Sequence, residues 1–230
     1  MRSGAELFGA RGWRRIRLWG LPAVCLLITL FVAAWFTPLL SVRTVQIEGL
    51  SAVPEERVRE LLEIPDGQSM LRIDTAAMAG RVASIPKVGS VRVQRSFPST
   101  VRVTITERTP VLFYTSERGA HLLDAQGVEY AIEPPPIGVP ELRADHPGSA
   151  DPATRAAVSV VTALPPALRV QVGEVAVRSI SDIALRLRDG RTVLWGGAGD
   201  AERKVAVVGP LLTRPGTVFD VSSPNLVTVK

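Results

Sequence analysis

The stretch SIPKVGSVRVQRSFPSTVRVTITERTP, residues Ser84–Pro110, decides the fold of this 230-residue chain. Apolar and polar residues alternate on both sides of Phe97–Ser99, which is the period of half-buried β-strands. The stretch therefore predicts a hairpin with one apolar face and one face of Arg and Thr. Because a two-stranded hairpin is not stable alone, we expect the residues upstream to cover its apolar face.

Two short helices are predicted upstream of the hairpin. Val42–Glu48 alternates like a strand, and Ser51–Leu62 is expected to form a helix with Pro54 in its first turn. Asp74 is a suitable N-cap for a second helix that ends before Pro86. The order strand, helix, helix, strand, strand provides two amphipathic helices to cover one face of a three-stranded sheet.

The formal net charge of +5 is concentrated at the N-terminus, where five arginines and one glutamate precede Leu40. The rest of the chain is close to neutral, which argues against a nucleic-acid-binding protein, because phosphate binding needs a concentrated cationic face. Only three of the 27 basic residues are lysines, a composition typical of a GC-rich genome. The single cysteine, Cys25, excludes an intramolecular disulfide.

Residues 18–42 contain no charged residue before Arg43 and are long enough for one membrane-spanning helix of about 20 residues. The arginines on their N-terminal side predict a cytoplasmic N-terminus and an extracytoplasmic C-terminal region, a single-pass type II topology in the cell membrane. A cleaved signal peptide is the alternative, with a weak cleavage site at Val32–Ala34. The apolar region of a signal peptide usually has only about 7–15 residues, which favours the anchor.

From Pro110 onward the sequence predicts a second domain that consists mostly of strands. A turn is expected at Ser116–Gly119, and the proline-rich run Glu133–Pro140 is expected to cross the surface as an extended belt. Two helices are predicted, one with Asp151 as its N-cap and one capped by Asp200. Further strands are expected at Val111–Thr115, Ala120–Leu123, Val175–Val177, Ile183–Leu187, Thr192–Trp195, Val218–Val221 and Leu226–Val229.

No catalytic constellation emerges from the sequence. The two histidines, His121 and His146, have no metal-ligand spacing, so we expect packing or surface roles for them and no metal or cofactor. There is no G-x-S-x-G for a serine nucleophile, and the glycine-rich run before Lys204 lacks the spacing of a phosphate loop. We therefore expect a protein that is not an enzyme.

Four motifs stand in order along the chain: VQIEGL at Val45–Leu50, Asp74 in LRID, the stretch Ser84–Pro110, and D-x-x-G at Asp124–Gly127. Together they closely resemble the FtsQ/DivIB family of bacterial division proteins. The resemblance covers nearly the whole chain. It implies an α+β fold with a single N-terminal transmembrane helix, then a POTRA domain, which is a small β-α-α-β-β module, and a mixed β-sheet domain with two flanking helices. The expected parts are a basic arm at 1–17, the transmembrane helix at 18–42, the POTRA domain at 43–109 and the β-domain at 110–230.

The last run, Ser222–Lys230, is the candidate interaction site, because a terminal strand often lies at a sheet edge that can add a strand of a partner. An inert edge protected by Pro224 and Lys230 is the alternative. The resemblance implies that the C-terminal strands bind the small bitopic protein FtsB (DivIC), which pairs with FtsL. It also places a structural or partner-facing ion pair at Lys204, for which a solvated charge is the alternative. The candidate contact residues are Trp195, Lys204, Asp220, Ser223, Leu226, Val227, Thr228 and Val229.

The edge of the POTRA hairpin is a second candidate interface. It is accompanied by the family signature, which consists of Pro86, Val88, Arg95, Phe97, Pro98, Glu107, Arg108 and Pro110.

We therefore expect a non-enzymatic, membrane-anchored scaffold of the division septum that binds the FtsB/DivIC–FtsL pair outside the membrane. Such a scaffold would link early and late division proteins and control septal peptidoglycan synthesis, acting indirectly on the synthases FtsW and FtsI, with no nucleic acid and no small-molecule substrate. Two alternatives stay open. A POTRA chaperone module for outer-membrane assembly would require a downstream barrel of strands. An anchored extracytoplasmic hydrolase would show a pocket with paired carboxylates or a Ser–His contact.

Overall fold

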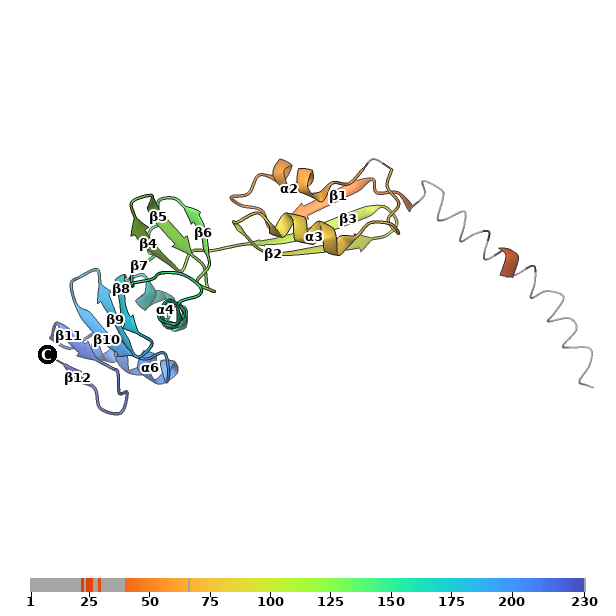
Figure 1. Cartoon of the computed structure of the whole chain (residues 1–230). Helices are drawn as coiled ribbons and strands as arrows, with labels where there is room; N and C mark the ends of the chain where they lie inside the picture. The colour runs from red at the N-terminus through yellow and green to blue at the C-terminus, as the bar shows by residue number, and fades with distance from the viewer. Residues whose placement is uncertain (1–21, 23, 27–28, 30–39, 66, 230) are drawn as a thin grey trace, which may run out of the picture. The chain divides into compact units, whose positions relative to one another are not determined.

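The computed structural model describes residues 22, 24–26, 29, 40–65 and 67–229 (Figure 1). The chain divides into two compact units between Glu107 and Arg108. The basic arm expected at 1–17 and most of the membrane helix expected at 18–42 lie outside the described residues. Among the residues that are described, no helix has both the length and the apolar character needed to cross a bilayer.

The first unit is a three-stranded sheet with two helices. Strand β1 (Thr44–Glu48) pairs in parallel with β3 (Thr100–Glu107), and β3 pairs antiparallel with β2 (Val88–Ser96). Strand β3 is therefore central, with β1 and β2 at the edges. The helices α2 (Glu55–Leu62) and α3 (Thr75–Ala83) lie between β1 and β2 in the chain, as predicted (Figure 1).

The alternation predicted for the hairpin is confirmed in β3. Val101, Val103 and Ile105 are at most 3% exposed, whereas the residues between them face solvent. The helices complete this core from one side, with Val58 and Leu62 from α2 and Met78 and Val82 from α3. The apolar face of the hairpin is thus covered as expected.

The second unit is built on one nine-stranded sheet, in which the strand order is β12-β11-β10-β9-β8-β7-β4-β5-β6. The pairs β4–β7, β7–β8 and β10–β11 are parallel and the others antiparallel, so the predicted mixed sheet is confirmed. Helices α4 (Pro152–Ala163) and α6 (Ala201–Leu211) bury their apolar residues in one core with the strands. The strands are β4 (Leu112–Ser116), β5 (Gly119–Leu123), β6 (Glu129–Ile132), β7 (Glu141–Arg143), β8 (Val172–Ser179), β9 (Asp182–Leu187), β10 (Thr192–Gly196), β11 (Val218–Asp220) and β12 (Thr228–Val229).

Three elements of the second unit were not predicted. Strands β6 and β7 are only four and three residues long, too short to show a periodicity, yet β7 lies centrally between β4 and β8. The short helix α5 (Pro166–Arg169) begins at Pro166. Proline suits the first position of a helix, because the N–H group that it lacks would have no hydrogen-bond partner within the helix at that position.

The predicted N-caps have different outcomes. Asp74 accepts hydrogen bonds from the N–H groups of Ala76 and Ala77, and Asp151 caps α4 in the same way, so both predictions are confirmed. The prediction for Asp200 was wrong, because its side chain makes no capping hydrogen bond and its backbone is left-handed, with φ of 55°. Helix α2 also begins at Glu55 rather than Ser51, for a reason that lies in Glu107.

Glu107 ends β3 and closes the loop before α2. Its carboxylate accepts hydrogen bonds from the N–H groups of Ser51, Ala52 and Val53, at 2.8 to 3.1 Å. These N–H groups are therefore not available to begin a helix. Burial opposes ionisation of Glu107, but the three backbone donors and the nearby Lys87 outweigh it and hold the pKa of its carboxyl below the ordinary value of 4.5.

We predict that Glu107→Gln destabilises the first unit by about 1–3 kcal/mol at pH 7, because a neutral amide is a weaker acceptor for the three donors. Since the pKa of Glu107 is lowered in the folded state, its contribution to the stability of the first unit is fully present above pH 4.5 and is lost as the pH falls below that value. The difference between wild type and variant in thermal unfolding should therefore shrink at pH 3.5. The control is Glu48→Gln, an exposed residue of β1. Equal effects of the two variants would contradict the prediction.

Candidate functional site

Strand β12 lies at one edge of the nine-stranded sheet, as predicted for the terminal strand. It pairs with β11 alone, through Phe219 with Val229 and Asp220 with Thr228. Because backbone groups alternate in direction along a strand, those of every second residue of β12 point away from β11. The described part of the chain thus presents a backbone edge to which another strand can be added.

The side chains of this edge alternate between solvent and core. Leu226 is 76% exposed and Thr228 is exposed, whereas Val227 and Val229 are half-buried and pack against the core of the unit. A leucine side chain that is three-quarters exposed makes few packing contacts in the free protein and can bury much apolar surface on binding. Leu226 is therefore the side chain at this edge that is best placed to contact a partner.

The turn between β11 and β12 is held by Asp220. Its Oδ1 atom accepts from the N–H of Ser222 at 2.9 Å and from the Ser222 hydroxyl at 2.7 Å. The N–H of Leu226 then donates to the carbonyl oxygen of Ser223 at 2.9 Å. Asp220 and Ser223, both predicted as contact residues, thus have internal roles in bringing β12 back beside β11.

Gly196, which the sequence did not single out, makes this return possible. It is the last residue of β10 and has φ of 72°, and a Cβ atom there would lie 2.8 Å from the Cβ of Ser222. Only glycine therefore fits without a shift of the chain after β11. The available signal was the glycine-rich run Gly196-Gly197-Ala198-Gly199, which we weighed only as a phosphate loop.

Trp195 and Lys204 were predicted to contact a partner, and the structure corrects this. Trp195 has no exposed surface, and Lys204 is 3% exposed. The ammonium of Lys204 donates to the carbonyl oxygens of Trp195 at 2.9 Å and Gly197 at 2.7 Å, and lies 5.7 Å from the centre of the Trp195 ring. Burial lowers the pKa of Lys204, although Asp200 opposes this. Lys204 is a structural residue, because two carbonyls at the end of β10 need its protons.

The signature residues around the POTRA hairpin are also divided between interior and surface. Val88 is 1% exposed, so its side chain cannot be part of an interface, whereas Pro86, Arg95, Phe97 and Pro98 are exposed. Arg95 donates to the carbonyl oxygen of Ile73.

The signature continues into the second unit with Arg108 and the half-buried Pro110. Arg108 forms an ion pair with Asp124, the first residue of the D-x-x-G motif, which is 2% exposed. The other carboxylate oxygen of Asp124 accepts from the N–H groups of Gln126 and Val128. Arg108 therefore neutralises a buried carboxylate that shapes the turn before β6.

A cluster of polar side chains that was not predicted joins β4, β5 and β6 at the other end of the sheet. His121 is fully buried, and its Nδ1 lies 2.7 Å from Glu129 Oε1 and its Nε2 2.7 Å from the hydroxyl of Ser116. Tyr114 stacks on His121 and donates to the other oxygen of Glu129 at 2.6 Å. Sequence spacing does not reveal this cluster, because its members come from three strands.

The pKa values in this cluster follow from its hydrogen bonds. The pKa of Glu129 is lowered mainly by the hydrogen bond from Tyr114, with a smaller effect of His121, while burial opposes the change. Burial and the same hydrogen bond raise the pKa of Tyr114 to about 12. The described residues contain no group of three His, Cys, Asp or Glu side chains that could hold a metal ion.

Comparison with known proteins covers both units. Residues 40–108 match the family model described as "POTRA domain, FtsQ-type", and residues 113–222 match "Cell division protein FtsQ/DivIB, C-terminal". The chain is 47% identical over 227 residues to the cell division protein FtsQ of Mycobacteroides abscessus, with 96% of this chain and 73% of that protein covered.

Two further relatives carry the same name. The chain is 44% identical to FtsQ of Mycolicibacterium smegmatis, with 94% of this chain covered, but spans only 65% of the length of that protein. It is 32% identical to FtsQ of Corynebacterium glutamicum, with 90% of this chain and 94% of that protein covered.

We predict that Gly196→Ala loosens the edge formed by β11 and β12, because the new methyl group meets Ser222 and the left-handed backbone disfavours alanine. The loss of stability should be about 1–2 kcal/mol. Amide hydrogen exchange at residues 218–229 should become faster. Gly199→Ala is the matched control, because a Cβ atom there has nothing within 4 Å. Unchanged exchange in Gly196→Ala would contradict this account of the edge.

Proposed function

The chain belongs to the FtsQ/DivIB family of bacterial cell division proteins, and on this basis we propose that it is a non-enzymatic scaffold of the division machinery. Residues 18–42 anchor it in the cell membrane, with the N-terminus in the cytoplasm and both folded units outside. At the septum it binds the FtsB/DivIC–FtsL pair and thereby connects early and late division proteins.

The observation that carries this proposal is the open edge at β12. An added strand of the partner forms main-chain hydrogen bonds with this edge, and the side chains beside it select the partner. Leu226 offers an exposed apolar contact, and Thr228 lies two residues further on the same side. Three buried or closely packed residues support binding indirectly, because they hold the end of β10, with which β11 pairs, and β12 pairs with β11. They are Trp195, Lys204 and Gly196.

The scaffold acts on septal peptidoglycan synthesis without chemistry of its own. Holding the FtsB/DivIC–FtsL pair at the septum brings that pair to the synthases FtsW and FtsI, whose activity is then controlled through contacts. An edge strand suits this role, because assembly and release depend on backbone pairing and a few side chains rather than on a substrate pocket.

We predict that Leu226→Glu weakens binding of the FtsB/DivIC partner about tenfold or more without lowering thermal stability. The leucine has little packing to lose, and its burial by a partner is worth about 1.5–3 kcal/mol. The measurement is a titration of the purified chain with the extracytoplasmic part of the partner. Ile137→Glu is the control, because Ile137 is fully exposed on the proline-rich segment of the same unit. Equal affinities of Leu226→Glu and wild type would rule out this contact.

Val227→Pro tests the backbone part of the same proposal. Proline removes one N–H donor beside β12, so we predict weaker partner binding while the first unit stays folded. Unchanged affinity would show that the partner does not add a strand at this edge.

A hydrolase is the second candidate, because Ser116, His121 and Glu129 are connected like a nucleophile, a base and an acid. Two observations favour a structural role instead. His121 has no exposed surface, and the Ser116 hydroxyl also accepts from the N–H of Arg118 at 3.1 Å, so this donor serves the hydroxyl and not a developing oxyanion. The cluster is better explained as a polar link between three strands.

We predict that the chain does not react with a fluorophosphonate probe, and that Ser116→Ala lowers stability by about 0.5–1.5 kcal/mol through loss of its hydrogen bonds. Ser159→Ala, on the exposed side of α4, is the control for stability. Labelling of wild type that disappears in Ser116→Ala would establish the hydrolase and overturn the structural interpretation.

A further inference from the structure

The last residues of the uncharged run 18–42, together with Arg43, are hydrogen-bonded to one end of the first unit. The N–H of Met70 donates to the carbonyl oxygen of Leu40 at 2.7 Å, and the N–H of Val42 donates to that of Gln68 at 2.8 Å. The N–H of Arg43 donates to the carbonyl oxygen of Ser99, in the hairpin turn, at 2.8 Å. The described end of the run at residues 40–42 thus belongs to this end of the unit, which also includes Arg43, the loop 68–72 and the turn 97–99.

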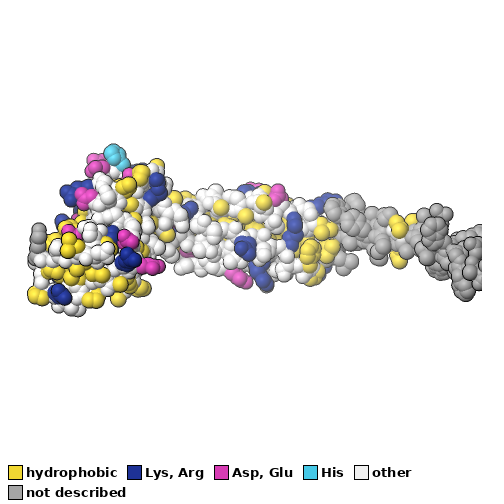
Figure 2. Space-filling view, turned by 90° about the horizontal axis from the view of Figure 1, so that it is seen from below, with side chains coloured by type: hydrophobic (Ala, Val, Ile, Leu, Met, Phe, Trp, Pro, Cys, Tyr) yellow, Lys and Arg dark blue, Asp and Glu magenta, His cyan; other side chains and the backbone are white. Residues whose placement is uncertain are grey.

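This anchor-side end carries apolar and basic side chains together. Phe97 is 57% exposed at the hairpin turn, where small polar residues are the usual choice, and Arg43 and Arg72 are exposed. On the face shown in Figure 2, hydrophobic and basic side chains lie beside each other at the N-terminal end of this unit.

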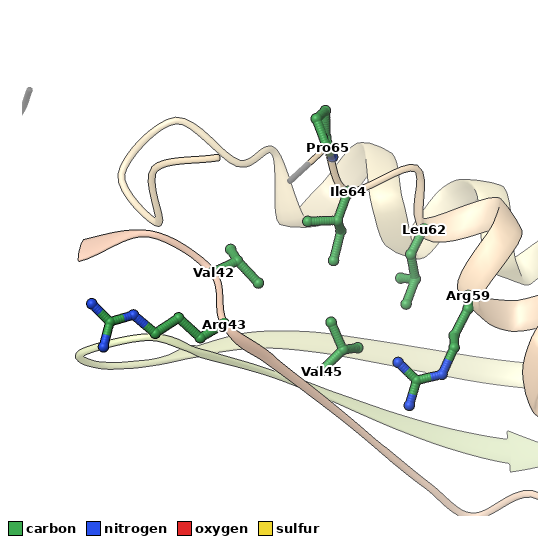
Figure 3. Close-up of a pocket in the computed structure, with 7 residues that line it drawn as sticks. All are labelled: Val42, Arg43, Val45, Arg59, Leu62, Ile64 and Pro65. Atoms are coloured by element: carbon green, nitrogen blue, oxygen red, sulfur yellow. The ribbon is translucent and has the colours of Figure 1, made fainter. Parts of the chain in front are cut away.

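A hollow of about 250 Å³ adjoins this end, between the start of β1 and the end of α2 (Figure 3). Its walls include Val42, Leu62 and Ile64, and the side chain of Arg43 points away from these three residues. Among the described acidic side chains of α2 and the residue after it, Glu55 pairs with Arg59 and Glu63 with Arg81.

Distances place this end close to the bilayer once the anchor is in place. Three residues from Leu40 to Arg43 span at most about 11 Å. The headgroup layer adds about 5–7 Å on each side of the hydrocarbon core, and charges interact over about 8 Å at physiological salt. Arg43 and the hairpin turn bonded to it are therefore within reach of the headgroups.

We propose that the anchor-side end rests on the outer surface of the membrane, with Phe97 at the lipid interface and Arg43 and Arg72 facing anionic phospholipid headgroups. This inference rests on the proposed anchoring by residues 18–42. The contact restricts how the first unit can tilt on its anchor. The end of β3 at Glu107 then lies at most about 23 Å further from the membrane than its start at Thr100.

The test uses the full chain with Cys25→Ser and one environment-sensitive probe on Ser99→Cys, reconstituted in vesicles of phosphatidylcholine and phosphatidylglycerol. The control probe is on Ser90→Cys, an exposed residue of β2 that is about 20 Å from the turn along the strand. A spin-labelled lipid should quench the probe at 99 several-fold more than the probe at 90. Adding Phe97→Ser, with an unchanged circular dichroism spectrum, should remove most of that difference.

Equal quenching at the two positions, in protein that floats with the vesicles, overturns the proposal while anchoring holds. Protein that does not float shows instead that the proposed anchoring is wrong. Quenching at 99 that is the same in vesicles of phosphatidylcholine alone overturns the role of anionic headgroups.

Discussion

The first unit depends on the central strand β3 and on the two residues at its exit. The apolar face of β3, formed by Val101, Val103 and Ile105, must be covered by helices to be buried. Both other strands of the sheet pair with β3. At the exit, Glu107 binds three N–H groups of the first unit, and the next residue, Arg108, binds the buried Asp124 of the second. Two adjacent charged residues thus make their contacts in two different units, which explains why the boundary between the units falls sharply between Glu107 and Arg108.

In the second unit, buried polar side chains form hydrogen bonds near both ends of the nine-stranded sheet. At one end, the polar cluster around His121 joins β4, β5 and β6 through side chains. At the other end, the ammonium of Lys204 satisfies two carbonyls after β10, and Gly196 lets the chain after β11 pass closely. The buried lysine is costly to desolvate, but removing it would leave two carbonyls without their donor. The edge at β12 is therefore shaped by residues that are not themselves accessible.

The sequence predicted what depends on local pattern and missed what depends on distant contacts. The hairpin, the caps Asp74 and Asp151 and the position of the terminal strand follow from periodicity and capping chemistry, and all are confirmed. Strand β7 was missed because pairing with β4 and β8, rather than its own three residues, makes it a strand. Trp195 and Lys204 were misplaced for a related reason, since burial is set by how α6 packs on β10.

The shortness of β12 limits what backbone pairing alone can contribute. Strand β12 has only two residues, Thr228 and Val229, so one of them faces outward and offers about two main-chain hydrogen bonds of about 1 kcal/mol each. A total of about 2 kcal/mol corresponds to binding weaker than 1 mM, too weak for a lasting assembly. A short edge also protects the free protein from pairing with its own copies. Affinity and selection must therefore come from side chains, which is why the exposed Leu226, rather than the buried Trp195, carries the proposed interaction.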